Sequence, residues 1–171
     1  MKVVLTFVSL WMICLAGHAQ SSRAIADPEF DRTLTSLLKN EVPALSTAAL
    51  AGCTEDYLVL DTRSREEFEV SHLENALWTG YSEFDSSLLG SVPVDAPIVC
   101  YCSVGYRSER IVAKLQSLGY KKVFNLYGGI FEWVNRGFPV VNSEGRITHR
   151  IHGYNKKWSR WILHPAMRVI Y

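Results

Sequence analysis

The sequence predicts an α/β protein with a five-stranded, mainly parallel sheet and helices on both faces. Strand-like apolar runs alternate with segments whose apolar residues recur at helical spacing, and this alternation is typical of parallel sheets. The chain has 171 residues, of which 48% are hydrophobic and 20% are charged. This length and composition fit one globular domain with extensions rather than a disordered or fibrous chain.

The chain divides into four regions. Residues 1–19 have the pattern of a secretory signal peptide, because Lys2 precedes a short apolar run that ends in small residues. We therefore expect an exported protein, periplasmic or secreted after cleavage, with an uncleaved membrane anchor as the alternative. The remaining regions are an N-terminal lead and helix over 20–41, a domain over 42–141, and a basic, aromatic extension over 142–171.

The first half of the domain follows a helix that Asp27 and Pro28 open and that ends near Asn40. Pro43 restricts the next apolar run to an edge strand, because proline cannot donate to a sheet. Capping residues then mark two short helices, at Ser46 and at the Ser64-x-x-Glu67 box. The other predicted elements here are strands over 57–60 and 76–78 and a helix over 81–89.

The second half of the domain is marked by glycines. A strand over 98–101 is followed by a helix over 108–118, which Gly119 ends. A strand over 123–126 and a helix over 130–135 complete the pattern. In parallel sheets the chemistry lies at the carboxyl ends of the strands, and both Asp61 and Cys102 fall at such ends.

Cys102 is the strongest candidate for a catalytic residue. It ends an apolar strand and leads through Gly105 into a helix, where backbone N–H groups lack partners and favour negative charge. These groups would lower the pKa of the thiol and hold an anionic substrate above the sulfur. Arg107 adds a permanent cation with several donors. An inert buried thiol is the alternative, but glycine and arginine at these offsets favour a nucleophile.

The remaining cysteines and charges narrow the function further. Without residues 1–19 the chain would keep three cysteines, so at least one thiol has no intrachain partner, which fits a reactive Cys102. Cys100 lies inside the apolar run and is expected to be buried and reduced. No second cluster of ligands accompanies these cysteines, so we predict no metal site. The nearly neutral net charge of +1 gives no argument for nucleic acid as a partner.

Four separated motifs together resemble the rhodanese-like sulfurtransferases. The first begins at Asp61, the second contains His72, the third runs from Cys102 to Arg107, and the fourth contains Trp133. The second motif departs from the family pattern because Ser71 and Asn75 replace glycines. The motifs occupy residues 61–68, 71–76, 102–107 and 126–133, the last followed by Gly137 and Pro139.

This resemblance implies a sulfur-transfer cycle without a metal or an organic cofactor. Thiolate Cys102 would take a sulfane sulfur from thiosulfate or a persulfide and pass it to a thiol or cyanide. Arg107 would neutralise the donor, the Asp61 carboxylate would accept hydrogen bonds from the active loop, and Arg63 would brace the neighbouring loops. The loop residues that would bind the substrate are Ser103, Val104, Gly105, Tyr106 and Arg107, and Ser108 would help to cap the following helix.

Two other functions compete with sulfur transfer. Phosphatases of this general fold have a loop one residue longer between cysteine and arginine, whereas four residues separate Cys102 from Arg107. The shorter loop suits a sulfur atom better than a phosphoryl group. The second competitor is an exported persulfide carrier or redox thiol protein that presents Cys102 to a partner without rapid turnover.

From Arg146 onward the extension contains six Lys or Arg residues and no acidic residue. Basic residues with tryptophans suit contact with a membrane surface. We favour the alternative, in which Trp158, Trp161 and Ile162 pack on the domain and leave the cations in solvent.

Overall fold

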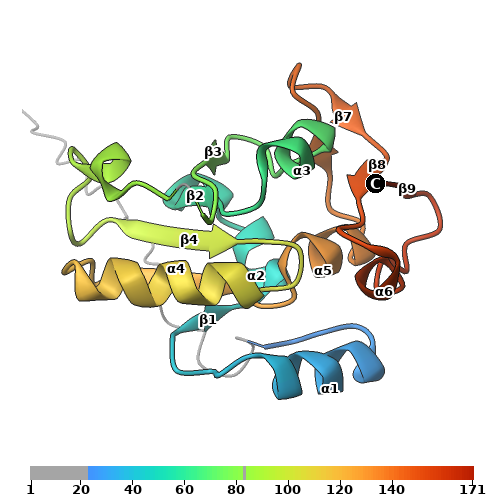
Figure 1. Cartoon of the computed structure of the whole chain (residues 1–171), viewed down its shortest axis with the longest axis horizontal. Coiled ribbons are helices and arrows are strands. Elements are labelled where there is room, and N and C mark those ends of the chain that lie inside the picture. The colour runs from blue at the N-terminus through green and yellow to red at the C-terminus, as the bar shows by residue number, and fades with distance from the viewer. Residues whose placement is uncertain (1–22, 83) are drawn as a thin grey trace, which may run out of the picture.

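The computed structural model describes residues 23–82 and 84–171, so the predicted signal peptide over 1–19 lies outside the described residues. The chain folds around a five-stranded sheet in the order β1-β5-β4-β2-β3, and all four pairings are parallel (Figure 1). This confirms the predicted fold class. Across the described ranges, no helix has the length and apolar character needed to cross a membrane.

The elements alternate along the chain as the sequence predicts. The strands of the sheet are β1 (Ala44–Leu45), β2 (Leu58–Asp61), β3 (Leu77–Trp78), β4 (Pro97–Tyr101) and β5 (Lys122–Leu126). The helices are α1 (Pro28–Leu37), α2 (Thr47–Ala51), α3 (Arg65–Val70), α4 (Tyr106–Ser117), α5 (Gly129–Asn135) and α6 (Lys156–Ser159), with 3-10 turns η2 (Thr54–Asp56) and η3 (Ser86–Leu89). Two small sheets pair β6 (Val140–Val141) with β7 (Ile147–Thr148), and β8 (Arg150–His152) with β9 (Arg168–Ile170).

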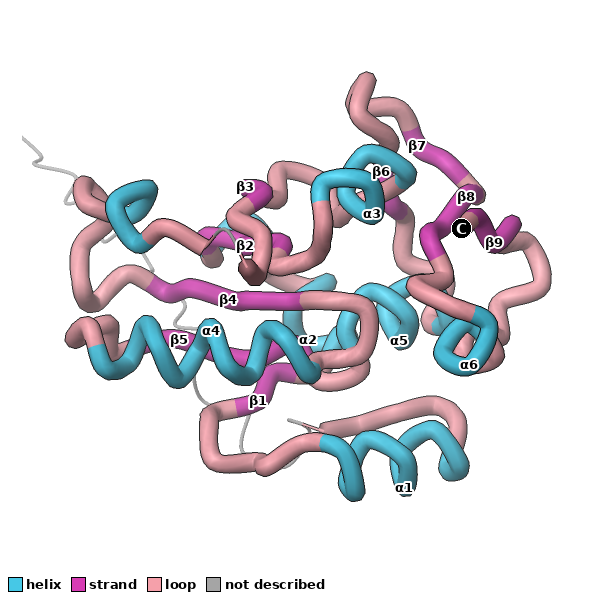
Figure 2. Tube along the Cα trace, viewed as in Figure 1, coloured by secondary structure: helices cyan, strands magenta, loops and turns pink. Residues whose placement is uncertain are grey.

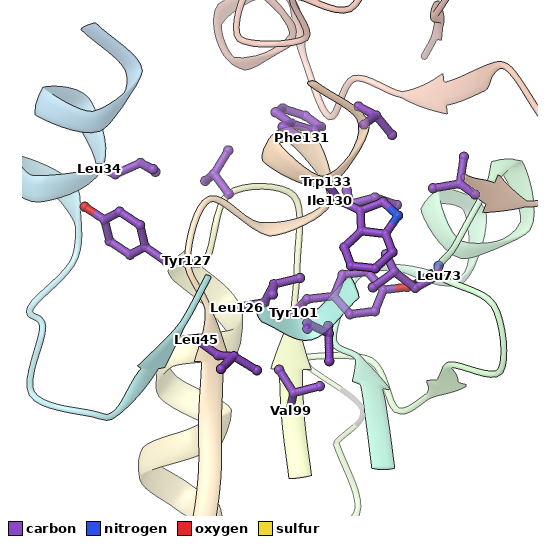
Figure 3. Close-up of a cluster of buried hydrophobic side chains, with 14 of the residues drawn as sticks. Leu34, Leu45, Leu73, Val99, Tyr101, Leu126, Tyr127, Ile130, Phe131 and Trp133 are labelled. Carbon is purple, nitrogen blue, oxygen red and sulfur yellow. Dashed lines mark hydrogen bonds between the residues drawn. The ribbon is translucent and has the colours of Figure 1, made fainter. Parts of the chain in front are cut away.

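The central strand β4 divides the core into two clusters because its side chains alternate between the faces of the sheet. Ile98 and Cys100 pack with α4 residues such as Val112 on one face. Val99 and Tyr101 pack on the other face with α1, α2 and α5 (Figure 3). Both faces of the sheet are therefore covered. At its carboxyl end, β4 leaves the covered sheet and continues into a loop.

The predicted capping residues begin three of the helices. The Asp27 carboxylate accepts hydrogen bonds from two amides of α1, and the Ser46 hydroxyl accepts one from Ala49 in α2. Ser64 and Glu67 form the complete capping box of α3, with each side chain accepting from the other's backbone amide. Local hydrogen bonding thus fixes these starts independently of the core.

Two predicted helix starts differ from the structure. The helix over 81–89 is wrong: only η3 forms, because Asp85 caps the turn at Ser87 and the helical geometry begins no earlier than Ser86. The next helix, α4, begins at Tyr106 instead of residue 108, because Gly105 adopts a φ of 107° and serves as its N-cap. This left-handed conformation costs glycine little.

The C-terminal extension, residues 142–171, packs on the domain beside α3 and α5. The β4 arrow points toward this side of the molecule (Figures 1 and 2). Trp161 is 5% exposed and stacks on Phe30 of α1, with ring centroids 5.2 Å apart. Ile151 of β8 is fully buried in the same core cluster. The Asn135 side chain at the end of α5 donates to the Trp161 carbonyl and accepts from the Leu163 amide. The extension is therefore part of the folded core.

Candidate active site

Cys102 lies directly after β4, at the carboxyl edge of the sheet, and only 1% of its surface is exposed. The following residues turn the chain into α4 within three positions. Cys102 and the turn form one side of a pocket of about 570 Å³. The sulfur atom therefore lies at the base of a cavity large enough for a small molecule.

The loop after Cys102 turns its amides toward the sulfur because its carbonyls accept hydrogen bonds from other segments. The N–H groups of Ile130 and Phe131, in the first turn of α5, donate to the carbonyls of Cys102 and Ser103 at 2.9 and 3.1 Å. The Gly105 carbonyl accepts from the Asn125 side chain at 3.1 Å. With the carbonyls held outward, the Gly105 amide donates to the Cys102 Sγ at 3.2 Å.

This arrangement stabilises the thiolate. Burial alone would raise the pKa of Cys102, but the charge of Arg107 and hydrogen bonds from the amides of Ser108 and Val104 outweigh it, so the pKa is lowered. Amides of the predicted loop thus surround the sulfur, and Ser108 contributes its backbone as well. The result is a buried sulfur that favours its nucleophilic form.

Arg107 carries the only charge that faces Cys102 from α4, and Glu67 holds it. Its Nη1 and Nη2 donate to the two carboxylate oxygens of Glu67 at 2.7 and 2.8 Å. Glu67 also accepts from the Ser103 hydroxyl at 2.8 Å. Burial would raise the pKa of Glu67, but its bonds and charge contact with Arg107 lower it to about 2. Arg107 therefore lies beside the sulfur within a neutral ion pair.

Glu67 is one residue of this site that the sequence reasoning missed. Its sequence position places it in the capping box of α3 and in the motif over 61–68, and neither feature predicts a role at Cys102. The capping role is real, because Oε2 also accepts from the Ser64 amide at 3.0 Å. The signal lay in the capping box itself, which places a carboxylate just beyond the carboxyl end of β2. The neighbouring strand β4 ends at the same edge, next to Cys102.

Asp61 and Arg63 form a second, sealed ion pair. Arg63 Nη2 lies 2.6 Å from Asp61 Oδ2, both side chains are 0% exposed, and the same nitrogen donates to the Ser71 carbonyl at 2.6 Å. The expected hydrogen bonds from the active loop to Asp61 are absent among the described contacts, and Arg63 donates to both carboxylate oxygens instead. The pair instead ties the end of β2 to the segment after α3.

Ser108 and Tyr106 occupy positions set by the early start of α4. Ser108 lies in the first turn rather than at the cap, and its hydroxyl donates to the Asn125 Oδ1 at 2.7 Å. Asn125 thereby links the helix to the Gly105 carbonyl. Tyr106 is 39% exposed and lines the pocket, and the Arg110 guanidinium lies 3.5 Å from the centre of its ring.

The pocket also includes residues outside the predicted domain. Tyr154 and Trp158 line it from the extension, and Leu37 lines it from α1. No local sequence signal marked them, because their position depends on how the extension packs. Within the described ranges, no group of three or more His, Cys, Asp or Glu residues is placed to hold a metal ion.

Comparison with known proteins gives a consistent result. The model of the rhodanese-like domain family matches residues 46–136. A sulfurtransferase from Allochromatium vinosum is 34% identical over 106 residues, which cover 62% of this chain and 98% of that protein. A rhodanese-related protein from Thermoplasma volcanium has a solved structure with a TM-score of 0.53 and 28% identity, covering 58% of this chain and 97% of its own.

A second group of relatives is much longer than the matched region. The tRNA uridine(34) hydroxylase of Escherichia fergusonii is 34% identical over 125 residues, which cover 68% of this chain. The match spans only 35% of that hydroxylase. It therefore concerns only part of the hydroxylase, and relatives named for different activities share similarity with this chain.

Proposed function

Because this chain belongs to the rhodanese-like domain family, we propose that it is a sulfurtransferase that carries a sulfane sulfur on Cys102. The observation that carries the proposal is the buried Sγ, whose pKa is lowered and which accepts the Gly105 amide at 3.2 Å. A thiolate held in this way attacks soft electrophilic sulfur without a general base.

The first half-reaction loads the cysteine. With thiosulfate as donor, the Cys102 thiolate attacks the sulfane sulfur, a new S–S bond forms to Sγ, and the donor's own S–S bond breaks. Sulfite leaves with the electron pair, and Cys102 becomes a persulfide. The amides that stabilise the thiolate can also stabilise the terminal sulfur of the persulfide, because it carries the negative charge after transfer.

The second half-reaction unloads it. The carbon of cyanide, or a thiolate acceptor, attacks the terminal sulfur of the persulfide. The S–S bond breaks, the electron pair returns to Sγ, and the thiolate is restored. Thiocyanate or an acceptor persulfide is released, so the cycle needs no external oxidant or reductant.

A cysteine phosphatase is the weaker alternative for two reasons. Only four residues separate Cys102 from Arg107, which gives a tight loop. The guanidinium that would bind a phosphoryl group is instead paired through both terminal nitrogens with Glu67. Both features favour a single sulfur atom over a phosphate at this position.

Turnover tests the proposal directly. Purified protein with thiosulfate and cyanide, or with a persulfide donor and a thiol acceptor, should form thiocyanate or transferred persulfide. Cys102→Ala should reduce the rate to background, whereas Cys100→Ala should keep it, because Cys100 faces α4 and not the pocket. Equal rates for the wild type and Cys102→Ala across these donors would refute the proposed enzymatic activity.

A persulfide carrier or redox thiol protein would give a different pattern. Mass spectrometry after exposure to a sulfane donor would show one added sulfur on Cys102, but turnover with small acceptors would stay at background. In that case an exported partner protein would be the acceptor. The two measurements together therefore separate catalysis from carriage.

We also propose that the protein is exported through cleavage of residues 1–19. Support comes from the basic start and apolar run of that segment. Intact mass or N-terminal sequencing of the protein recovered from the cell envelope would show a start at Gln20. A protein that retains Met1 in the cytosolic fraction would contradict export, and one that retains it in the membrane would indicate an anchor.

A further inference from the structure

The pocket over Cys102 has a lining that a thiosulfate transferase does not need. Its walls are mostly aromatic and aliphatic, and they come from separated parts of the chain. Two of its aromatic residues, Tyr154 and Trp158, lie in the extension, beyond residues 46–136 that match the family. The apolar and aromatic residues that line the pocket are Leu37, Tyr81, Val104, Tyr106, Tyr154 and Trp158.

The extension is held in place on either side of these two residues, of which Tyr154 is 51% exposed. The stack of Trp161 on Phe30 and the buried Ile151 anchor it on both sides of the segment that carries Tyr154. Asn155 caps α6 by accepting from the Trp158 amide at 3.1 Å. The aromatic residues at the pocket therefore belong to a packed structure, and not to a loose tail that happens to lie nearby.

The backbone of Tyr154 supports a functional role. Its φ is 61°, in the left-handed region that bulky residues rarely adopt. The conformation aims the tyrosine ring at the site, where the Arg107 guanidinium lies 5.2 Å from the ring centre. Glycine or asparagine would fit this backbone with less strain, so a tyrosine here suggests that the ring itself is required.

The charges in the pocket point to the same class of substrate. The Arg107 cation is paired with Glu67, and the Arg63 cation is sealed away with Asp61. Among the described residues that line the pocket, Arg107 is the only one with a cationic side chain. A doubly charged donor would therefore depend on the loop amides and on a cation already paired with Glu67, whereas a singly charged donor with an apolar group uses both the amides and the walls.

We infer that Tyr154 and Trp158 make the Cys102 pocket selective for sulfur donors that carry one negative charge and a flat apolar group. The inference rests on the proposed sulfur transfer and specifies its substrate class. Organic thiosulfonates test it, because each has a single charge and a sulfane sulfur. Cys102 attacks that sulfur, the bond between it and the sulfonyl sulfur breaks, and a sulfinate leaves with the electron pair.

The experiment compares benzenethiosulfonate with methanethiosulfonate as donors to cyanide. The wild type should favour the aromatic donor by roughly 10- to 100-fold in kcat/KM, because a phenyl ring adds apolar burial and aromatic contact. Tyr154→Ala and Trp158→Ala should each lower this preference several-fold, because each removes part of the wall that the phenyl ring contacts. Dividing the preference of the wild type by that of each variant cancels the intrinsic difference in reactivity between the two donors.

Two further variants separate selectivity from folding. Tyr154→Gly relieves the backbone strain, so its Tm should equal or exceed that of the wild type while the aromatic preference falls. Ile147→Ala changes an extension residue that is 71% exposed and lies outside the pocket lining, and it should keep the wild-type preference. An unchanged preference in both Tyr154 variants and in Trp158→Ala would overturn the inference.

A binding measurement separates this inference from the proposed activity. Benzenesulfinate should slow the alkylation of Cys102 by iodoacetamide at lower concentrations than methanesulfinate does, and Trp158→Ala should remove the difference. If no donor is turned over but this protection holds, the sulfurtransferase activity fails and the pocket selectivity stands. If methanethiosulfonate is turned over but the sulfinates protect equally, the selectivity fails and the activity stands.

Discussion

Cys100 and Cys102 lie two residues apart and are almost equally buried, at 0% and 1% exposure, yet their thiols have opposite properties. Burial raises the pKa of Cys100 far above its ordinary value, whereas the pKa of Cys102 is lowered. The difference is the end of β4. Cys100 is paired on both sides, with Leu60 and Asn125, so its surrounding amides belong to the sheet. Cys102 follows the last paired residue, where amides are available for the sulfur.

The comparison teaches that exposure does not decide reactivity here. A thiol in the apolar core loses the solvation of its charged form and gains nothing in return. A thiol one step beyond the sheet loses the same solvation but gains backbone donors and the charge of Arg107. The position of the cysteine relative to the strand end therefore separates a structural residue from a reactive one.

The largest expected effect is a difference in alkylation rate between the two thiols. At neutral pH, iodoacetamide should modify Cys102 on the order of 100 times faster than Cys100, since Cys102 is more often a thiolate and lines the pocket. Peptide mapping by mass spectrometry over a time course measures both rates. An unfolded sample serves as the control for the intrinsic rates of the two thiols. Similar rates for Cys102 and Cys100 in the native protein would contradict the comparison.

The second effect concerns Gly129, which lets α5 approach the loop. A Cβ on Gly129 would lie 2.7 Å from the Ser103 carbonyl oxygen and would also collide with the Cys102 carbonyl. Gly129→Ala should therefore cost on the order of 3 kcal/mol of unfolding free energy, from strain at positive φ and from overpacking. It should also raise the pKa of Cys102, since the displaced loop no longer directs its amides to the sulfur.

Gly119→Ala is the matched control. Gly119 also has a positive φ, of 96°, but a Cβ there would meet nothing within 4 Å. This variant should lose only the backbone strain, about 1 kcal/mol, and keep the reactivity of Cys102. Urea unfolding of both variants separates the two contributions. Equal losses would mean that contact between Gly129 and the loop does not hold the site.

The local part of this site could be predicted from the sequence, as Cys102 and Gly105 illustrate. An apolar strand, a cysteine, a glycine and an arginine follow each other within a few residues, so the geometry that joins them is almost fully set by the chain. The sulfur and its amides are consequently found where the pattern indicates. Even the difference between the predicted and observed starts of α4 has a local cause, the left-handed conformation of Gly105.

The parts that could not be predicted depend on contacts between distant segments. Glu67 satisfies a local capping rule, and nothing in that rule says that the same carboxylate also binds Arg107, 40 residues later. Tyr154 reaches the site because Trp161 packs on Phe30 and the buried Ile151 holds the extension on the domain. Such pairings are chosen by the packing of the whole core, which the local pattern does not encode.

The third effect is a loss of stability in acid that originates at Glu67. Its pKa is lowered from 4.5 to about 2 in the folded protein, so its stabilisation is complete above pH 4.5 and is lost as the pH falls toward 2. The loss should approach about 3 kcal/mol in the wild type. It should release the loop of Cys102 rather than the strand that holds Cys100.

Urea unfolding across this pH range measures the effect. Glu67→Gln should be less stable than the wild type at pH 7, because Arg107 loses its charged partner, and its stability should depend less on pH between 4.5 and 2. Glu144→Gln is a suitable control, since Glu144 pairs with Arg146 on the exposed surface. Parallel pH profiles for the wild type and Glu67→Gln would show that another carboxylate causes the acid loss.

The smallest expected effect separates the two sources of thiolate stabilisation at Cys102. Arg107→Gln should raise the pKa of Cys102 by about 1 unit, because the nearby cation is lost while the amides remain. Arg107→Lys keeps the charge without the two-nitrogen geometry, so its Cys102 pKa should lie between those of Arg107→Gln and the wild type. The pH dependence of iodoacetamide alkylation gives each pKa. If both variants keep the wild-type value, the backbone amides alone distinguish Cys102 from Cys100, and Arg107 serves only to hold Glu67 and the loop in place.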